Sequence, residues 1–173
     1  HAIESIINKI NSTNKLYNEI KDLYERAKKL NGFIFHATGS GKTLTSFKTF
    51  QILSQELNCN KVIFLVDRLD LNSQTMEEFK KYSNDELDQT ESSSHLEKQL
   101  KDPNIPLIVT TIQKISRLLK KNNELYRKQN SDITNSNIIF IIDECHRTQF
   151  GDMHKIIRKT FLKSRLIGFT GTP

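Results

Sequence analysis

The sequence predicts an α/β fold in which a mostly parallel sheet carries helices on both faces. Short apolar runs recur along the chain, and none alternates cleanly with polar residues, which is typical of strands buried on both faces. These runs are Gly32–His36, Lys61–Val66, Leu107–Thr110, Ile138–Ile142 and Leu166–Phe169. Segments with helical spacing separate them, and this strand–helix–strand alternation indicates an open α/β sheet.

The segments between the strands that have helical periodicity are Lys42–Leu57, Asn72–Lys81, Gln113–Leu119 and Met153–Leu162. Apolar residues also recur at helical spacing through the first thirty residues, where we expect the polar run Asn11–Asn14 to cap a second helix. Two polar stretches interrupt the order. Ser83–Pro106 is expected to hold one short helix, His95–Lys101, between loops, and Lys120–Asn137 is expected to be a mobile excursion. Neither stretch indicates a domain boundary.

Composition narrows the class of protein. Hydrophobic residues make up 36% of the 173 residues, and the mean hydropathy is -0.53. No stretch approaches the roughly 20 apolar residues that a membrane helix requires, which excludes a membrane-spanning protein. Two cysteines cannot build a disulfide framework and no signal-peptide pattern is present, so we expect a cytoplasmic location. The net charge of +6 favours polyanionic partners such as nucleotides or nucleic acid, although a soluble basic domain would carry the same charge.

The strongest motif is the segment His36–Thr43, which follows a predicted strand and opens a predicted helix. This is the context of a phosphate-binding loop, because glycines let successive backbone N–H groups face one anion and the helix start adds its positive dipole end. The residues expected to surround the phosphates are Thr38, Gly39, Ser40, Gly41, Lys42 and Thr43. Lys42 can reach the β- and γ-phosphates, and the Thr43 hydroxyl can bind Mg²⁺. A chance strand–loop–helix with the same glycines is the alternative interpretation.

A second motif lies at the end of a predicted buried strand, where Asp143 and Glu144 follow Ile142 directly. Such a strand delivers its terminal carboxylates to the edge of the sheet where α/β folds bind ligands. Asp143 is placed to hold Mg²⁺, directly or through water, and Glu144 to orient and deprotonate an attacking water. An ordinary strand-ending turn is the alternative, and the phosphate loop upstream makes it the weaker one. Zinc is not expected, because Cys145 and His146 match no zinc-binding spacing.

Together these stretches resemble the motifs of superfamily 2 helicases and translocases. The phosphate loop, the box Asp143–His146 and the run Gly168–Pro173 come in the order of motifs I, II and III of that superfamily. More narrowly, the chain resembles the motor (restriction) subunit of type I restriction-modification enzymes. The stretches that carry this narrower resemblance are His36–Thr45, Val66–Leu71, Val109–Lys114 and Asp143–Gly151. His36 stands where most phosphate loops have Gly or Ala, and it is usual in that subunit.

The resemblance implies a RecA-like P-loop NTPase domain. Residues 32–173 would be the first of two motor lobes, and residues 1–31 a helical lead-in to it. The strand leading to motif III would lie between the phosphate-loop strand and the Asp–Glu strand. Thr170 and Thr172 would then lie close to the γ-phosphate and to His146. The catalytic residues implied in this way are Lys42, Asp143, Glu144 and His146, with ATP and Mg²⁺ as cofactors.

The resemblance also implies contacts with the phosphate backbone of a DNA strand. The residues concerned follow the second and third strands and are Arg68, Thr110, Thr111 and Gln113. Their hydroxyl, amide and guanidinium groups are suitable donors, and such contacts carry no sequence information. Two alternatives remain open at this point. Arg68 can form an ion pair with Asp67 or Asp70, and the two threonines can cap the helix that follows them.

Several parts of such a motor are not among these residues, and we expect the chain to be a piece of a larger protein, since it begins at His1 and ends after an apolar run. The implied partners are duplex DNA, a second RecA-like lobe and a nuclease domain of the same protein, and the methylation and specificity subunits of a type I complex. Without the arginine finger of the second lobe, the isolated chain is expected to bind Mg-ATP weakly and hydrolyse it very slowly. The alternative functions are a lobe of another superfamily 2 helicase or type III restriction subunit, and a nucleotide-binding regulatory module that does not hydrolyse.

Overall fold

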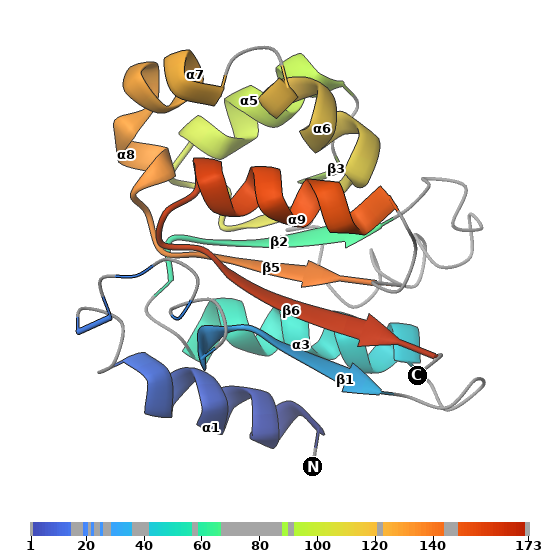
Figure 1. Ribbon diagram of the computed structural model, residues 1–173. Coiled ribbons are helices and arrows are strands. Elements are labelled where there is room, and N and C mark those ends of the chain that lie inside the picture. Colours follow the sequence, from blue (N-terminus) through green and yellow to red (C-terminus); the bar gives the residue numbers. More distant parts are fainter. Residues whose placement is uncertain are drawn as a thin grey trace.

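The computed structural model describes residues 2–14, 19–20, 22, 25, 29–35, 42–56, 59–66, 88–89, 92–120, 123–143 and 149–171. Its centre is a six-stranded sheet in the order β1-β6-β5-β2-β4-β3, and every strand pair is parallel (Figure 1). The strands are β1 (Gly32–Phe35), β2 (Lys61–Val66), β3 (Asp88–Gln89), β4 (Leu107–Thr111), β5 (Ile138–Ile142) and β6 (Arg165–Thr170). The predicted α/β class is therefore confirmed, and β6 lies between β1 and β5, where the resemblance placed it.

Helices cover both faces of the sheet (Figure 1). We call the side covered by α1 (Ala2–Asn14) and α3 (Lys42–Glu56) the α3 face. The opposite side is the α9 face. Its helices are α5 (Ser93–Lys101), α6 (Ile112–Lys120), α7 (Asn123–Gln129), α8 (Ser131–Thr134) and α9 (Gln149–Thr160). The helix predicted at Asn72–Lys81 lies outside the described residues. No described helix is both long and apolar enough to cross a membrane.

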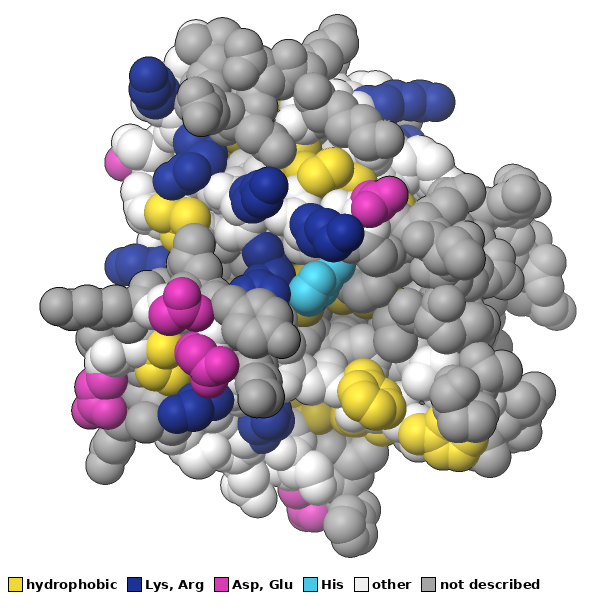
Figure 2. Space-filling view, viewed as in Figure 1, with side chains coloured by type: hydrophobic (Ala, Val, Ile, Leu, Met, Phe, Trp, Pro, Cys, Tyr) yellow, Lys and Arg dark blue, Asp and Glu magenta, His cyan; other side chains and the backbone are white. Residues whose placement is uncertain are grey.

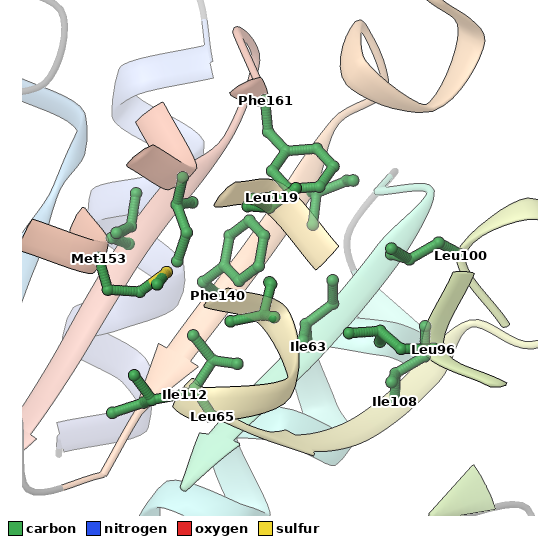
Figure 3. Close-up of a cluster of buried hydrophobic side chains, with 14 of the residues drawn as sticks. Ile63, Leu65, Leu96, Leu100, Ile108, Ile112, Leu119, Phe140, Met153 and Phe161 are labelled. Atoms are coloured by element: carbon green, nitrogen blue, oxygen red, sulfur yellow. The ribbon is translucent and has the colours of Figure 1, made fainter. Parts of the chain in front are cut away.

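The continuous apolar runs in the sequence are explained by two separate cores. Along β2, Phe64 packs on the α3 face while its neighbours Ile63 and Leu65 pack on the α9 face, and all six residues of the strand are buried. The core of the α9 face centres on Phe140 of β5, whose ring lies 5.4 Å from that of Phe161 between centroids (Figure 3). A strand packed on both sides has no polar face, so it shows no alternation.

The region Lys120–Asn137 was expected to be an excursion, and this prediction is wrong, because it contains α7 and α8. Among the residues whose side chains are described, Tyr126 of α7 and Ile133 of α8 pack into the core. Asn130 between them is buried and donates from Nδ2 to the carbonyl of Tyr126, at 3.0 Å. Helices of seven and four residues, with one or two apolar residues each, are too short to show helical periodicity.

The polar run Asn11–Asn14 does not open a helix within the described residues but forms the last turn of α1. The hydroxyls of Ser12 and Thr13 donate to the carbonyl of Lys9, at 2.9 and 2.7 Å. Ser and Thr side chains inside a helix bond back to the carbonyl three or four residues earlier in this way, so the polar run continues the helix and does not begin a new one.

The amino edge of the sheet, where the strands begin, is tied by asparagine side chains. Asn31, just before β1, accepts a hydrogen bond on Oδ1 from the backbone N of Leu166 in β6, at 2.9 Å. Asn60, just before β2, accepts one on Oδ1 from the backbone N of Asn137 before β5, also at 2.9 Å. Each asparagine therefore fixes the start of one strand against another segment of the chain.

Lys61, the first residue of β2, closes the same edge. Its side chain is buried, and Nζ donates to the carbonyls of Asp102 and Ile105, at 2.6 and 2.8 Å. Burial lowers the pKa of Lys61 below its usual value, and the charge of Asp102 opposes this effect. The lysine therefore holds the turn between α5 and β4 against the start of β2.

Candidate functional site

All the predicted site residues come after strands, so the carboxyl edge of the sheet is the candidate site. The strands point the same way, and their carboxyl ends lie along one side of the molecule (Figure 1). α/β folds bind ligands at this edge.

Asp143 directly follows β5 and continues the pairing of that strand. Its backbone N donates to the carbonyl of Leu65 in β2, at 3.1 Å, so the position of the residue is fixed by the sheet. The residue is only 5% exposed. A carboxylate buried to this degree requires hydrogen-bond donors or a cation beside it. The alternation along β5 places Asp143 on the side of Ile139 and Ile141, which is the α3 face.

Thr170 ends β6, the strand between β1 and β5. It is 4% exposed and lies opposite Phe35, the last residue of β1, in the strand register. On its other side β6 pairs with β5, with Gly168 opposite Ile142, the residue before Asp143. Adjacent strands are about 4.8 Å apart. Continuing this register, Phe169 lies opposite Asp143 and Thr170 lies one residue beyond it, so Thr170 is on the strand next to both β1 and β5. Alternation along β6 puts its side chain on the α9 face, whereas Asp143 is on the α3 face.

The helix that follows the predicted phosphate loop, α3, begins at Lys42, so the backbone of Lys42 and Thr43 forms its first turn. The helix is anchored to the sheet by Phe47 and Phe50, which share the α3-face cluster with the strands that end at Asp143 and Thr170. Its 15 residues run from this edge toward the amino edge (Figure 1). The N-terminus of α3, with its positive dipole end, thus belongs to the carboxyl edge.

Other predicted site residues lie outside the described residues, and their roles stay predictions. They are Thr38, Gly39, Ser40, Gly41, Arg68, Glu144, His146 and Thr172. The side chains of Lys42 and Thr43 are likewise outside the description, although their backbone belongs to α3. The prediction that Lys42 and Asp143 lie at the same site is therefore supported by the order of the strands and the position of α3, and not by a side-chain distance.

The two threonines that end β4 are not at the surface. Thr110 is fully buried on the side of Ile108, and its Oγ1 has no hydrogen-bond partner among the described residues. Thr111 is 5% exposed, and its Oγ1 accepts a hydrogen bond from the backbone N of Lys114, at 3.2 Å. This is the N-cap of α6, the alternative that the sequence left open for Thr111. Direct contact of either hydroxyl with a DNA phosphate is incompatible with this conformation.

Gln113 is different, because it lies half-buried in the first turn of α6 and lines an open groove between α6 and α9. The groove has a volume of about 410 Å³. Its lining residues are Ile112, Gln113, Ser116, Arg117, Asp152, Met153 and Ile156. The sequence analysis did not find this groove. The spacing of Gln113, Ser116 and Arg117 along one helix face was the available signal.

The chemistry of the described positions suits a magnesium nucleotide. A buried carboxylate at a strand end and a hydroxyl in the first turn of a helix are oxygen ligands, which Mg²⁺ prefers. The helix N-terminus beside them favours a phosphate.

Comparison with known proteins identifies the family. A family model described as SWI2/SNF2 ATPase matches residues 1–173, the whole chain. The chain belongs to the SWI2/SNF2 ATPase family. Among curated relatives, it is 49% identical over 173 residues to a type I restriction enzyme endonuclease subunit of Staphylococcus saprophyticus, a match covering 100% of this chain and 17% of the relative. The chain thus spans about a sixth of that relative's length.

A shorter relative is covered more fully. It is a protein of Mycoplasma pneumoniae, described as the C-terminal part of a putative type I restriction enzyme endonuclease subunit. The chain is 41% identical to it over 162 residues, covering 92% of this chain and 75% of the relative. The resemblance to type I restriction enzymes is therefore confirmed, and this SWI2/SNF2 ATPase-family chain is a helicase-like ATPase domain of that group.

Solved structures share the fold. The Type ISP restriction-modification enzyme LlaGI, solved with a DNA substrate mimic, matches with a TM-score of 0.56 and 21% identity, over 89% of this chain and 17% of that one. The SWI2/SNF2 ATPase core of Sulfolobus solfataricus, solved with double-stranded DNA, matches with a TM-score of 0.56 and 19% identity, over 92% and 31%. The predicted RecA-like fold is confirmed by these matches.

Proposed function

We propose that this chain is the ATP-binding first motor lobe of a type I restriction enzyme subunit. In the longer polypeptide, ATP hydrolysis would drive translocation along duplex DNA before a nuclease domain outside these residues cleaves it. Residues 32–173 would form the lobe, and residues 1–31 its helical lead-in. The observation that carries the proposal is the strand order β1-β6-β5, which sets Thr170 between the phosphate-loop strand and Asp143.

In this proposal, the residues at the carboxyl edge have separate roles in phosphoryl transfer. Mg-ATP, when bound, supplies the phosphoanhydride bond that is cleaved and a cation that neutralises its charge. The α3 N-terminus and Lys42 would hold the phosphates, and Asp143 with Thr43 would hold the cation. Glu144 would orient the attacking water and accept its proton. Thr170 and His146 would relay the state of the γ-phosphate to the DNA-contacting side of the lobe.

For DNA, we propose Gln113 and Arg68 as contacts with the phosphate backbone. Gln113 is the member of the predicted set that is both described and accessible, since it lines the groove between α6 and α9. The net charge of +6 supports a polyanionic partner. Two structural neighbours, the LlaGI enzyme and the Sulfolobus ATPase core, were solved with a DNA substrate mimic and with double-stranded DNA. The burial of Thr110 and Thr111 leaves those two residues a structural role.

The partners proposed for the longer protein are a second RecA-like lobe, a nuclease domain, and methylation and specificity subunits. The second lobe matters most for turnover, because an arginine supplied in trans accelerates related phosphate-loop enzymes by roughly 10³–10⁵. Hydrolysis by the isolated 173-residue chain is therefore expected to be very slow.

The first test is Lys42→Ala in the longer polypeptide, with nucleotide affinity measured by titration of a fluorescent ATP analogue. Loss of the ammonium that contacts the β- and γ-phosphates should weaken binding by about tenfold or more. Lys48→Ala is the matched control, because Lys48 is an exposed lysine on the same helix that donates to Gln51 Oε1 at 3.2 Å. Equal affinity of the two variants would contradict the phosphate-loop assignment.

The second test separates a motor from a nucleotide-binding module that does not hydrolyse. Glu144→Gln should preserve ATP affinity and reduce DNA-stimulated phosphate release by about 10²-fold or more, because the amide cannot accept the water proton. A wild-type protein that binds ATP without releasing phosphate, with or without DNA, would favour the regulatory module instead.

A further inference from the structure

The outer edge of β1 is open. β1 is an end strand of the sheet and pairs with β6 alone among the described strands. The backbone N–H and C=O groups on its other side therefore have no strand partner in the part of the chain that the structure describes. An unpaired edge of this kind is a template for another strand.

Two large apolar side chains stand beside this open edge. Phe33 is 73% exposed and Phe35 is 53% exposed, and no other large hydrophobic residue of the described chain is exposed. Figure 2 shows hydrophobic side chains at the surface where Figure 1 places β1, while Lys and Arg gather over α9. Adjacent exposed aromatics on an unpaired strand are typical of a contact surface rather than of a solvated one.

The open apolar surface lies on the α9 face. Ile34, between the two phenylalanines, packs against the α3-face cluster, so strand alternation puts Phe33 and Phe35 on the other side. The α3 face of β1 is already covered, because the Lys9 side chain of α1 comes within 3.5 Å of the position that a Cβ on Gly32 would occupy. Only the outer edge and the α9 face of β1 remain open.

The handedness of the connections predicts what fits there. The connection from β1 to β2 moves across the sheet in one direction, and its helix α3 lies on the α3 face. The connections from β3 to β4, β4 to β5 and β5 to β6 move in the opposite direction, and α5, α6 and α9 lie on the α9 face. All four connections thus have one hand, as parallel crossovers have in about 98% of cases. A further connection of the same hand, starting at the end of β6 and continuing in the direction from β5 to β6, would pass β1. It would put a helix on the α9 face over Phe33 and Phe35 and a strand beside the outer edge of β1.

We propose that the open edge of β1, with Phe33 and Phe35, is the docking site of a further strand and helix of the same longer polypeptide. The strand pairs parallel to β1, and the helix lies on the α9 face against the two phenylalanines. The length of a relative supports this occupant. The chain covers 17% of the Staphylococcus saprophyticus subunit, so a polypeptide of that length has further segments that could supply a strand and a helix. β6 ends at Thr170, opposite the last residue of β1, so a crossover that contains the helix can start beside the open surface and return to the amino edge. The inference rests on the part of the proposed function that makes this chain one lobe of a larger protein.

The first test measures access to the site in the longer polypeptide. Phe33→Cys is compared with Lys159→Cys on the exposed surface of α9 by the rate of reaction with a thiol reagent at pH 7.5. The parent protein, labelled in parallel, gives the background rate of its own cysteines, which is subtracted. Cys59 should contribute little to it, because burial raises its thiol pKa to about 11. If the site is covered, the Phe33→Cys thiol should react at least about tenfold more slowly than the Lys159→Cys thiol. Equal rates would overturn the proposal.

The second test identifies the occupant. A photo-crosslinking phenylalanine derivative at position 33 keeps the aromatic ring, so it avoids the packing loss of a cysteine. The proposal expects a crosslink within one polypeptide, mapped by peptide mass to a segment after residue 173. A crosslink to a second copy or to another subunit would overturn it, and so would the absence of a crosslink combined with fast thiol labelling. ATP affinity of the same preparation tests the proposed function separately, because neither phenylalanine is placed at the nucleotide.

Discussion

The two edges of the sheet use polar residues in opposite ways. At the amino edge, the side chains of Asn31, Asn60 and Lys61 bond to backbone groups of other segments and close the fold. At the carboxyl edge, Asp143 and Thr170 are buried at the ends of neighbouring strands, beside the start of the phosphate-loop helix. The polar side chains at these strand starts thus hold segments of the fold together, whereas Asp143 and Thr170 at the strand ends are the residues for which we propose a role at the nucleotide. Substitutions at the two edges should therefore separate into losses of stability and losses of activity.

The largest effect is expected at the carboxyl edge. Asp143→Asn should reduce DNA-stimulated phosphate release by the longer polypeptide about 10²-fold or more, because an amide holds a divalent cation poorly. Asp132→Asn is the control, since that carboxylate is exposed on α8, before the start of β5, and does not line the groove between α6 and α9. A similar activity for both variants would remove Asp143 from the site.

At the amino edge, Lys61→Met should act on stability and not on nucleotide binding. The variant keeps the apolar stem but loses both hydrogen bonds to the carbonyls of Asp102 and Ile105. The free energy of unfolding should fall by about 1.5–3 kcal/mol, as for hydrogen bonds to a charged group. Urea denaturation measures this, and ATP titration should give an unchanged affinity. A variant that is stable but no longer binds ATP would contradict the division between the edges.

The end of β4 gives a sharper contrast, because its two threonines differ in their hydrogen bonding. Thr111→Ala removes the N-cap of α6 and should lower the free energy of unfolding by about 1 kcal/mol, while Thr111→Ser should restore most of it. Thr110→Val replaces a buried hydroxyl that has no partner, so it should be neutral or stabilising. Equal destabilisation by Thr111→Ala and Thr110→Val, in urea denaturation, would contradict the capping geometry.

The smallest effect is a pH dependence at the amino edge. Because burial lowers the pKa of Lys61 in the folded state, the unfolded chain binds its proton more tightly. Unfolding then takes up a proton between the lowered pKa and the usual value of 10.5, so the contribution of Lys61 to stability rises with pH across that window. The difference in unfolding free energy between wild type and Lys61→Met should therefore grow as the pH is raised toward 10.5. A difference that shrinks would contradict the sign.

The strands and the site motifs could be predicted because their signals are local. The runs at Lys61–Val66 and Ile138–Ile142 are strands with the predicted bounds, since each holds five consecutive apolar residues bounded by polar ones, which is typical of a buried strand. Asp143 comes directly after the second of these runs, so its place at a strand end could be predicted from the same pattern. The predicted start of α9 at Met153 was four residues late, because Gln149–Asp152 contains polar residues and a glycine.

The remaining features depend on contacts between distant residues, and these leave no local pattern. Asn60 and Asn137 are 77 positions apart, and Lys61 bonds to carbonyls more than 40 positions away. The burial of Thr110 was missed for a related reason. β4 runs one residue further than predicted, to Thr111, so Thr110 lies inside the strand and points into the core.

The first helix has a consequence for where this lobe can be cut. A boundary at Gly32, just before the first strand, looks natural in the sequence. Yet Ile6 and Ile10 of α1 are buried in the same cluster as Phe47 and Phe50, and Arg165 of β6 donates from Nη1 to the carbonyl of Ile10, at 3.4 Å. Deleting residues 1–31 would strip one wall from the phosphate-loop helix and expose its aromatic side to water. A recombinant lobe that keeps α1 should stay soluble where one starting at Gly32 aggregates.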